Sequence, residues 1–285
     1  MQQTGTECEF SGSDSWVILS PIEQSIKRKI EAVGTPLKDW DVQINYGIKT
    51  GYNDAFIIST EKREEILANC QSEDERKRTA ELIRPILRGR DIKRYGYNWA
   101  NLWLINTHNG IRGKLERIHI EDYPAVKAHL DQYWDKISKR ADKGETPYNL
   151  RNCAYLEDFS KPKIVWGNLN LKPSYAIVED NSFINAPSPM IVPASRYLLA
   201  ILNSKLADYF IRQLGVTRNG GYFEYKPMFI EQLPVPQCLD DSILKEIDTN
   251  VAIKNEKTID TIVYSLYGLN DEEIQYVEKG TQEKY

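Results

Sequence analysis

Apolar residues recur at helical spacing along several parts of the chain. Between Pro21 and Val33, three isoleucines and the valine fall three or four positions apart, which predicts an amphipathic helix. Ser20 is placed to cap the first turn of this helix, and Gly34 to end it. The same pattern predicts further helices over residues 60–67, 76–83, 123–140, 196–214, 243–267 and 271–278.

Short apolar runs rich in β-branched and aromatic residues, bounded by turn-forming residues, predict strands between these helices. They cover residues 42–46, 55–59, 101–107, 161–166, 174–178, 186–192 and 225–232. Prolines interrupt the run at 186–192, so this strand is expected at a sheet edge. Because strands and helices mix without a regular strand–helix–strand order, the sequence predicts an α+β fold with a mixed sheet.

The tetrapeptide Leu-Pro-Val-Pro at 233–236 indicates a domain boundary, since proline restricts the backbone and donates no backbone hydrogen bond. We therefore expect three parts. Residues 1–40 form a flexible lead-in and a connecting helix, residues 41–237 form the main mixed-sheet domain, and residues 238–285 form a helical C-terminal segment.

The formal net charge of −4 is unevenly distributed. Residues 238–285 hold eleven acidic and five basic residues, a charge of −6, which leaves +2 for the rest. Residues 84–117 carry eight basic residues against two acidic ones. We infer that an acidic tail masks a locally basic body, which is compatible with binding to a polyanion.

No apolar run reaches the roughly 18 residues of a membrane-spanning helix, and the N-terminus lacks the pattern of a signal peptide. The four cysteines are far apart, and the three histidines are not near them in sequence, so we predict no metal site. These features indicate a cytoplasmic protein with reduced thiols and no membrane partner.

Three loops combine glycine with basic, amide and tyrosine side chains. The candidate contact residues are Lys49, Thr50, Tyr52 and Asn53 in the first loop, Arg88, Arg90, Lys93 and Arg94 in the second, and Arg218, Asn219, Tyr222 and Lys226 in the third. Those of the first loop are expected at an exposed loop tip. Arginine and asparagine pair with base edges, and lysine and arginine grip phosphate. A plain hairpin turn or a solvated charged loop remains the alternative for each.

Catalytic motifs are missing from the sequence. It contains no P-loop, no HExxH, no GxSxG and no Pro-Pro tetrapeptide of the kind found in adenine methyltransferases. The acid-x-Lys sequence Glu75-Arg76-Lys77 lies in a charged helical stretch and is not expected to be catalytic. We predict no catalytic residue and no cofactor in this chain.

Five segments occur in an order that is more specific than any one of them. They are GIKTGYNDAFII, IRPILRGRDIKRY, YNLRNCAYLEDFSKPKIVWGNL, YLLAILNSKLADYFI and FIEQLPVP. Together they resemble the TaqI-like C-terminal specificity domain of type IIG restriction–modification enzymes, and the likeness extends from Trp16 to Glu278. The resemblance implies that residues 41–237 are a target recognition domain.

The resemblance also implies partners. In that family an adenine-N6 methyltransferase domain, often joined to a nuclease domain, uses S-adenosylmethionine and Mg²⁺ and flips the adenine out of the duplex. This chain lacks the catalytic half, so it is expected to act with one in cis or in trans. Its own partner would be double-stranded DNA.

Our leading hypothesis is a sequence-specific DNA recognition module that is not an enzyme by itself. One alternative is a protein-interaction module in which the helix from Arg196 and the acidic C-terminal helices dock a catalytic subunit. Another is a cryptic nuclease or methyltransferase.

Overall fold

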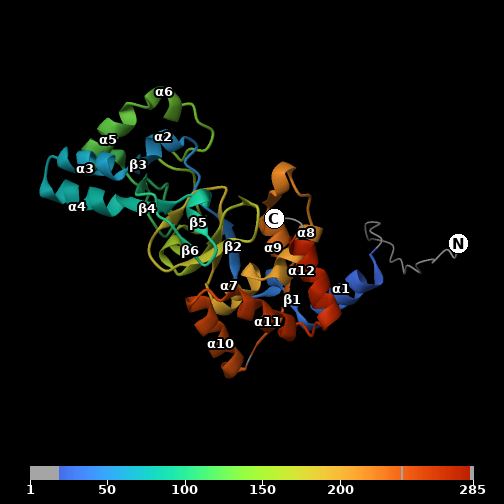
Figure 1. Cartoon of the computed structure of the whole chain (residues 1–285). Helices are drawn as coiled ribbons and strands as arrows, with labels where there is room; N and C mark the ends of the chain where they lie inside the picture. The colour runs from blue at the N-terminus through green and yellow to red at the C-terminus, as the bar shows by residue number, and fades with distance from the viewer. Residues whose placement is uncertain (1–18, 239, 283–285) are drawn as a thin grey trace.

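The structure is a computed structural model that describes residues 19–238 and 240–282. The predicted flexible lead-in falls largely on residues 1–18, which lie outside the described residues. Helices α2 to α6 gather on one side of the molecule, and α1 with α7 to α12 on the other, with strands between them (Figure 1). The fold is α+β, as the sequence predicts.

A four-stranded antiparallel sheet lies between the two groups of helices, in the order β10 (Tyr175–Val178), β8 (Lys163–Trp166), β12 (Pro189–Val192) and β2 (Gln43–Tyr46). Successive side chains on a strand point to opposite faces. Ile164 and Trp166 therefore enter one hydrophobic core, whereas Val165 between them enters the other. The two central strands, β8 and β12, are buried on both faces.

The first core contains the helices of the lower group in Figure 1 and a two-stranded pair that joins residues near 35 to residues near 235. Its elements are α1 (Pro21–Val33), β1 (Thr35–Pro36), α7 (Arg196–Asn203), α8 (Lys205–Gln213), β14 (Pro234–Val235), α10 (Asp241–Ala252), α11 (Glu256–Leu266) and α12 (Asp271–Gln282). Strand β1 pairs with β14, so the residues before the main domain join those that end it.

The second core lies under a smaller sheet of order β11 (Phe183–Ile184), β4 (Ile83–Leu87), β7 (Leu102–Ile105) and β3 (Ile57–Ser59). Only the β11–β4 pairing in this sheet is parallel. The helices of this part are α2 (Asn53–Phe56), α3 (Thr60–Ala68), α4 (Glu73–Leu82), α5 (Pro124–Asp131) and α6 (Trp134–Ile137).

Short elements complete the described chain. Two ribbons pair β5 (Ile92–Lys93) with β6 (Gly96–Tyr97), and β9 (Leu169–Asn170) with β13 (Phe223–Glu224). One short helix, α9, covers Pro227–Ile230. The 3-10 turns are η1 (Leu37–Asp39), η2 (Gly89–Asp91), η3 (Ile120–Asp122), η4 (Leu156–Ser160) and η5 (Asn219–Gly221).

The helix predicted over 21–33 is confirmed, and it begins and ends at the predicted residues. The Ser20 side chain accepts from the backbone of Glu23, and the Glu23 carboxylate accepts from the backbone of Ser20, a reciprocal cap.

Three longer predicted helices are each divided in two. Ser204 breaks the helix over 196–214, because its hydroxyl accepts from Ala207 N and starts a second helix.

Two strand predictions are wrong. Residues 225–232 form no strand, since Pro227 opens the short helix α9 instead. The strand near 186–192 lies inside the sheet and not at its edge. Pro187 lies outside the strand, and Pro189 is its first residue, where it faces Tyr46 of β2. Only Met190 and Ile191 pair with β8, so no proline removes a ladder bond to that strand.

The two cores do not follow the predicted segment limits at residues 40 and 237. Helices α1, α10, α11 and α12 share one core with α7 and α8 of the main domain. Residues Leu198–Asn203 of α7 are all buried, so this helix is covered within the chain.

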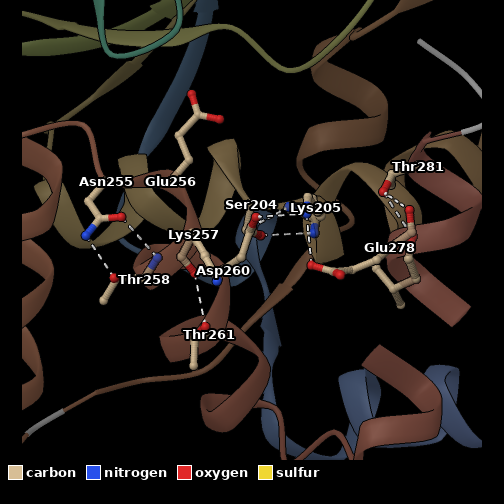
Figure 2. A network of polar contacts seen from close by, with 12 residues as sticks. Ser204, Lys205, Asn255, Glu256, Lys257, Thr258, Asp260, Thr261, Glu278 and Thr281 are labelled. Atoms are coloured by element: carbon tan, nitrogen blue, oxygen red, sulfur yellow. Dashed lines mark hydrogen bonds and ion pairs between the residues drawn. The ribbon is translucent and has the colours of Figure 1, made fainter. Parts of the chain in front are cut away.

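Acidic side chains of the C-terminal helices pair with the body of the protein. At the start of α8, Lys205 N donates to Asp260 Oδ1 (2.9 Å) and Lys205 Nζ donates to Glu278 Oε1 (2.9 Å), as Figure 2 shows. Glu273 pairs with Lys29 at 2.7 Å. The acidic tail therefore neutralises specific basic groups.

One buried cation makes the stability of the fold depend on pH. Lys163 is fully buried, and its ammonium donates to the carbonyl oxygens of Phe159 (2.8 Å), Asp180 (2.9 Å) and Lys161 (3.3 Å). Burial lowers the pKa of Lys163 to about 8. The unfolded chain keeps the ordinary lysine pKa of about 10.4.

Between these two pKa values the unfolded state binds one more proton, so stability rises with pH. We expect the free energy of unfolding of the wild type to rise by roughly 2 kcal/mol relative to Lys163→Met between pH 7.5 and 9.5, measured by urea denaturation. Lys161→Met, at an exposed lysine, should keep the rise. Parallel pH profiles for the wild type and Lys163→Met would contradict this assignment.

Candidate nucleic-acid interface

The first predicted loop connects β2 to α2. Lys49 and Asn53 are exposed, and Tyr52 is half-buried with its ring centroid 6.1 Å from that of Tyr133. Thr50 is buried, and its hydroxyl donates to Asn53 Oδ1 at 2.6 Å. The expectation that all four residues lie at an exposed loop tip is therefore wrong for Thr50, whose side chain holds Asn53 in place.

A pocket of about 500 Å³ lies over this loop. Besides the loop itself, residues 185–187 and Asp142 line it. Asn53 and Asn185 supply amide groups to the lining, and Lys49 supplies a cation. Asp54 and Asp142 add carboxylates, so the lining offers both donors and acceptors to a polar group.

Arg140, which the sequence did not single out, fixes the backbone of the first loop. It is buried, and its Nη1 donates to the carbonyl oxygens of Thr50 and Asp142. Its Nη2 donates to Pro147 O (3.0 Å) and Asn149 O (2.6 Å). Burial lowers the pKa of Arg140 to about 10, which leaves it cationic at neutral pH.

The Arg140 guanidinium also lies 4.4 Å from the centre of the Phe56 ring. One side chain thus joins two segments that lie ninety positions apart in sequence. The sequence showed only an arginine at the end of an amphipathic run, which is a common surface pattern. No local signal could have identified its partners.

The second loop is held by its own charges. Arg88 makes two side-chain hydrogen bonds to Asp91, at 3.0 and 2.8 Å. Burial alone would raise the pKa of Asp91, but the hydrogen bonds from Arg88 outweigh it, and the pKa lies below its usual value. Arg90 is exposed, and its carbonyl oxygen accepts from Lys93 Nζ at 2.7 Å.

Arg94 in the same loop points toward the C-terminal helices. It pairs with Glu256 at 2.6 Å and donates to Pro173 O at 3.2 Å. Its side chain is only 13% exposed. Arg94 therefore joins the loop to α11, while Arg90 and Lys93 face solvent.

The third loop is organised by Glu224. Its carboxylate pairs with Lys226 at 2.6 Å and with Arg218 at 3.1 Å. These two bonds, Lys226 first, hold the pKa of Glu224 below its usual value. Asn219 and Tyr222 are exposed on the same loop.

The three loops lie along one continuous line of contacts. Segment 184–188 links the first two, because Ala186 N donates to Ile48 O (3.0 Å) and Asn185 N donates to Leu87 O (2.8 Å). A Cβ at Gly89 would lie 2.8 Å from Ser188 Oγ and 3.3 Å from Gly167, so the second loop packs closely on both.

Residues 167–170 then lead to the third loop. Tyr225 N donates to Asn168 O at 2.8 Å, and Asn170 pairs with Phe223. The line therefore runs from Lys49 through residues 185–188 and Arg90 to Tyr222. Residues far apart in sequence meet along this line because β8 ends beside it and β12 begins beside it.

The described part of the chain holds no group of three or more His, Cys, Asp or Glu side chains that is placed to bind a metal ion. Within the same residues, every helix is too short or too polar to cross a membrane.

Replacing Arg140 by methionine should destabilise the folded protein by about 3 kcal/mol, because buried carbonyl oxygens lose their charged donor. The measurement is chemical denaturation at neutral pH. Lys139→Met is the matched control, since Lys139 is exposed one position earlier and should change stability by less than about 0.5 kcal/mol. Equal stability of the two variants would show that Arg140 does not fix the loop.

Comparison with known proteins finds relatives of this chain in sequence and in fold. The family model described as the TaqI-like C-terminal specificity domain matches residues 84–235, more than half of the chain. The type II methyltransferases M.PaeR7I of Pseudomonas aeruginosa and M.XhoI of Xanthomonas vasicola are each 20% identical over 272 residues. These alignments cover 92% of this chain but only 44% and 47% of the two relatives, so the chain spans less than half of their length.

Two solved structures share the fold. The type IIL restriction–modification enzyme MmeI, in complex with DNA, aligns with a TM-score of 0.60 and 13% identity over 87% of this chain and 36% of its own. The type IIG restriction endonuclease BpuSI aligns with a TM-score of 0.60 and 15% identity over 93% and 33%. With the family model matching both the second and third loops, the chain belongs to the family of TaqI-like C-terminal specificity domains.

Proposed function

We propose that this chain is a sequence-specific double-stranded DNA recognition module of a type IIG restriction–modification enzyme. The observation that carries the proposal is the continuous line of the three loops, which presents Lys49, Arg90 and Tyr222 along one path. A duplex is an extended polyanion whose grooves expose base edges. A line of exposed basic and amide side chains on a rigid sheet suits such a ligand.

The internal contacts divide the candidate residues into two roles. Lys49, Arg90 and Lys93 are exposed cations that would contact phosphates, and Asn53 and Asn219 would pair with base edges, together with Tyr52 and Tyr222. Thr50, Arg88 and Arg94 hold the loops in shape through Asn53, Asp91 and Glu256. Arg218 and Lys226 share Glu224 and border the third loop.

The chemistry would come from another part of the enzyme. The curated relatives are methyltransferases of which this chain spans less than half. We propose that the chain directs an adenine-N6 methyltransferase or an endonuclease that lies in the parent protein or on a partner. That catalytic part would use S-adenosylmethionine and Mg²⁺, and this chain would itself perform no catalysis.

Selection from a pool of randomised duplex DNA, followed by binding measurements over a range of salt concentrations, tests the proposal. The wild type should enrich a motif of several base pairs. Lys49→Ala and Arg90→Ala should each weaken binding to all sequences and lower the slope of log affinity against log salt by about one. Asn219→Ala should cost about 1–3 kcal/mol at one base position.

Lys77→Ala is the matched control, because Lys77 is an exposed lysine on α4, away from the line of loops. It should leave affinity and salt slope unchanged. Absence of an enriched motif would refute sequence recognition, and unchanged slopes for Lys49→Ala and Arg90→Ala would refute the assigned contacts.

A further inference from the structure

The ribbon formed by β9 and β13 has one buried and one exposed face. Phe223 is fully buried and pairs with Asn170, while Glu224 pairs with Leu169. Since successive residues alternate between faces, Leu169 lies on the outer face with Glu224. Leu171 and Tyr222 directly adjoin the two strands at the same end of the ribbon.

The ribbon and the residues adjoining it expose apolar groups. Leu169 is 50% exposed, Leu171 42% and Tyr222 43%. Two further large apolar residues lie on the segments beside the ribbon, Val216 at 81% exposed and Met228 at 54%. We call Leu169, Leu171 and Tyr222 the ribbon patch. Grouped apolar side chains on a surface indicate a binding site, whereas scattered ones do not.

Basic groups border the ribbon patch. Lys172 is exposed next to Leu171, and Arg218 and Lys226 lie at Glu224. These three cations and the single carboxylate of Glu224 leave a local charge of +2. The patch is thus apolar at its centre and cationic at its border.

A buried ion pair holds the base of the ribbon. Arg212 donates to both carboxylate oxygens of Asp208, at 2.9 and 3.1 Å, and to Tyr225 Oη at 2.9 Å. Arg212 Nη2 also donates to Leu171 O, and Trp166 Nε1 donates to Tyr225 O at 2.7 Å. Both strands are therefore fixed before any ligand binds, which lowers the entropic cost of binding.

We propose that the ribbon patch enters the major groove of the target duplex and recognises thymine through its C5 methyl group. This inference rests on the proposed function, that the chain binds duplex DNA. The major groove is about 12 Å wide and admits a two-stranded ribbon. The thymine methyl is the apolar group on the base edges there, so it is the match for leucine side chains.

Charge favours DNA over a protein partner. The cationic border complements phosphates on both sides of a groove. The patch also continues the line of loops that starts at Lys49.

The test compares selections by the full chain from two randomised duplex pools, one built with thymine and one with uracil, which lacks the methyl group. The enriched duplex is then remade with uracil at each thymine in turn. We expect uracil at one or more positions to weaken wild-type binding about fourfold. This corresponds to ~0.8 kcal/mol, the free energy of burying one group of methyl or methylene size.

Leu169→Ala and Leu171→Ala should remove this preference and bind both duplexes alike. Both leucines are exposed, so these variants should fold. Ile253→Ala, at an exposed isoleucine between α10 and α11, is the control that should keep the preference.

Several outcomes would overturn the inference. Equal wild-type affinity for thymine and uracil duplexes, or an enriched motif without thymine, would refute methyl recognition while leaving sequence-specific binding intact. A preference that survives in both leucine variants would place methyl recognition elsewhere. Leucine variants that bind DNA like the wild type but fail to associate with a catalytic part would make the patch a protein-docking surface. No enriched motif from either pool would refute the proposed function, and the inference with it.

Discussion

Strands β8 and β12 are buried on both faces, and the position of every candidate loop depends on this constraint. Val165 and Met190 enter one core, while Trp166 and Ile191 enter the other. A shift of one residue in register would exchange the two sets of side chains and leave neither core filled. Segment 167–170, which follows β8, and segment 185–188, which precedes β12, are therefore fixed in space. The contacts that join the three loops run through these two segments.

Charge in this protein is arranged in pairs, and this limits what net charge reveals about binding. Arg94 and Lys205 are basic residues of the main domain, yet each contacts a carboxylate of the C-terminal helices. Arg88 forms an ion pair with Asp91 within its own loop. The cations that face solvent along the line of loops are fewer than the sequence suggests. A buried or paired arginine contributes to shape, and an exposed one contributes to the attraction of phosphate.

Much of the fold follows from local patterns. The helix at 21–33, the α+β class and the strands β2, β3, β7, β8, β10 and β12 could be predicted because periodicity and caps are local properties. Strand β4 and the two-residue strands were not predicted. The breaks at Ser204 and near residue 254 come from caps by Ser204 and Asn255. Periodicity did not predict them, because serine and asparagine also occur inside helices. For the candidate site, glycine together with lysine or arginine marked three loops in the sequence. It could not reveal Arg140, whose partner Thr50 lies ninety residues away, nor the outward side chains of the ribbon, because the pairing of β9 with β13 is non-local.

The shared core of α1, β14 and the C-terminal helices bears on how this chain can be divided. Tyr267 Oη donates to Pro234 O at 2.6 Å, and Lys205 contacts two different C-terminal helices. A cut at the proline pair would separate residues that fill one interior and expose that interior to water on both fragments. The two fragments are therefore expected to be unstable apart and to fold only together, as one cooperative unit.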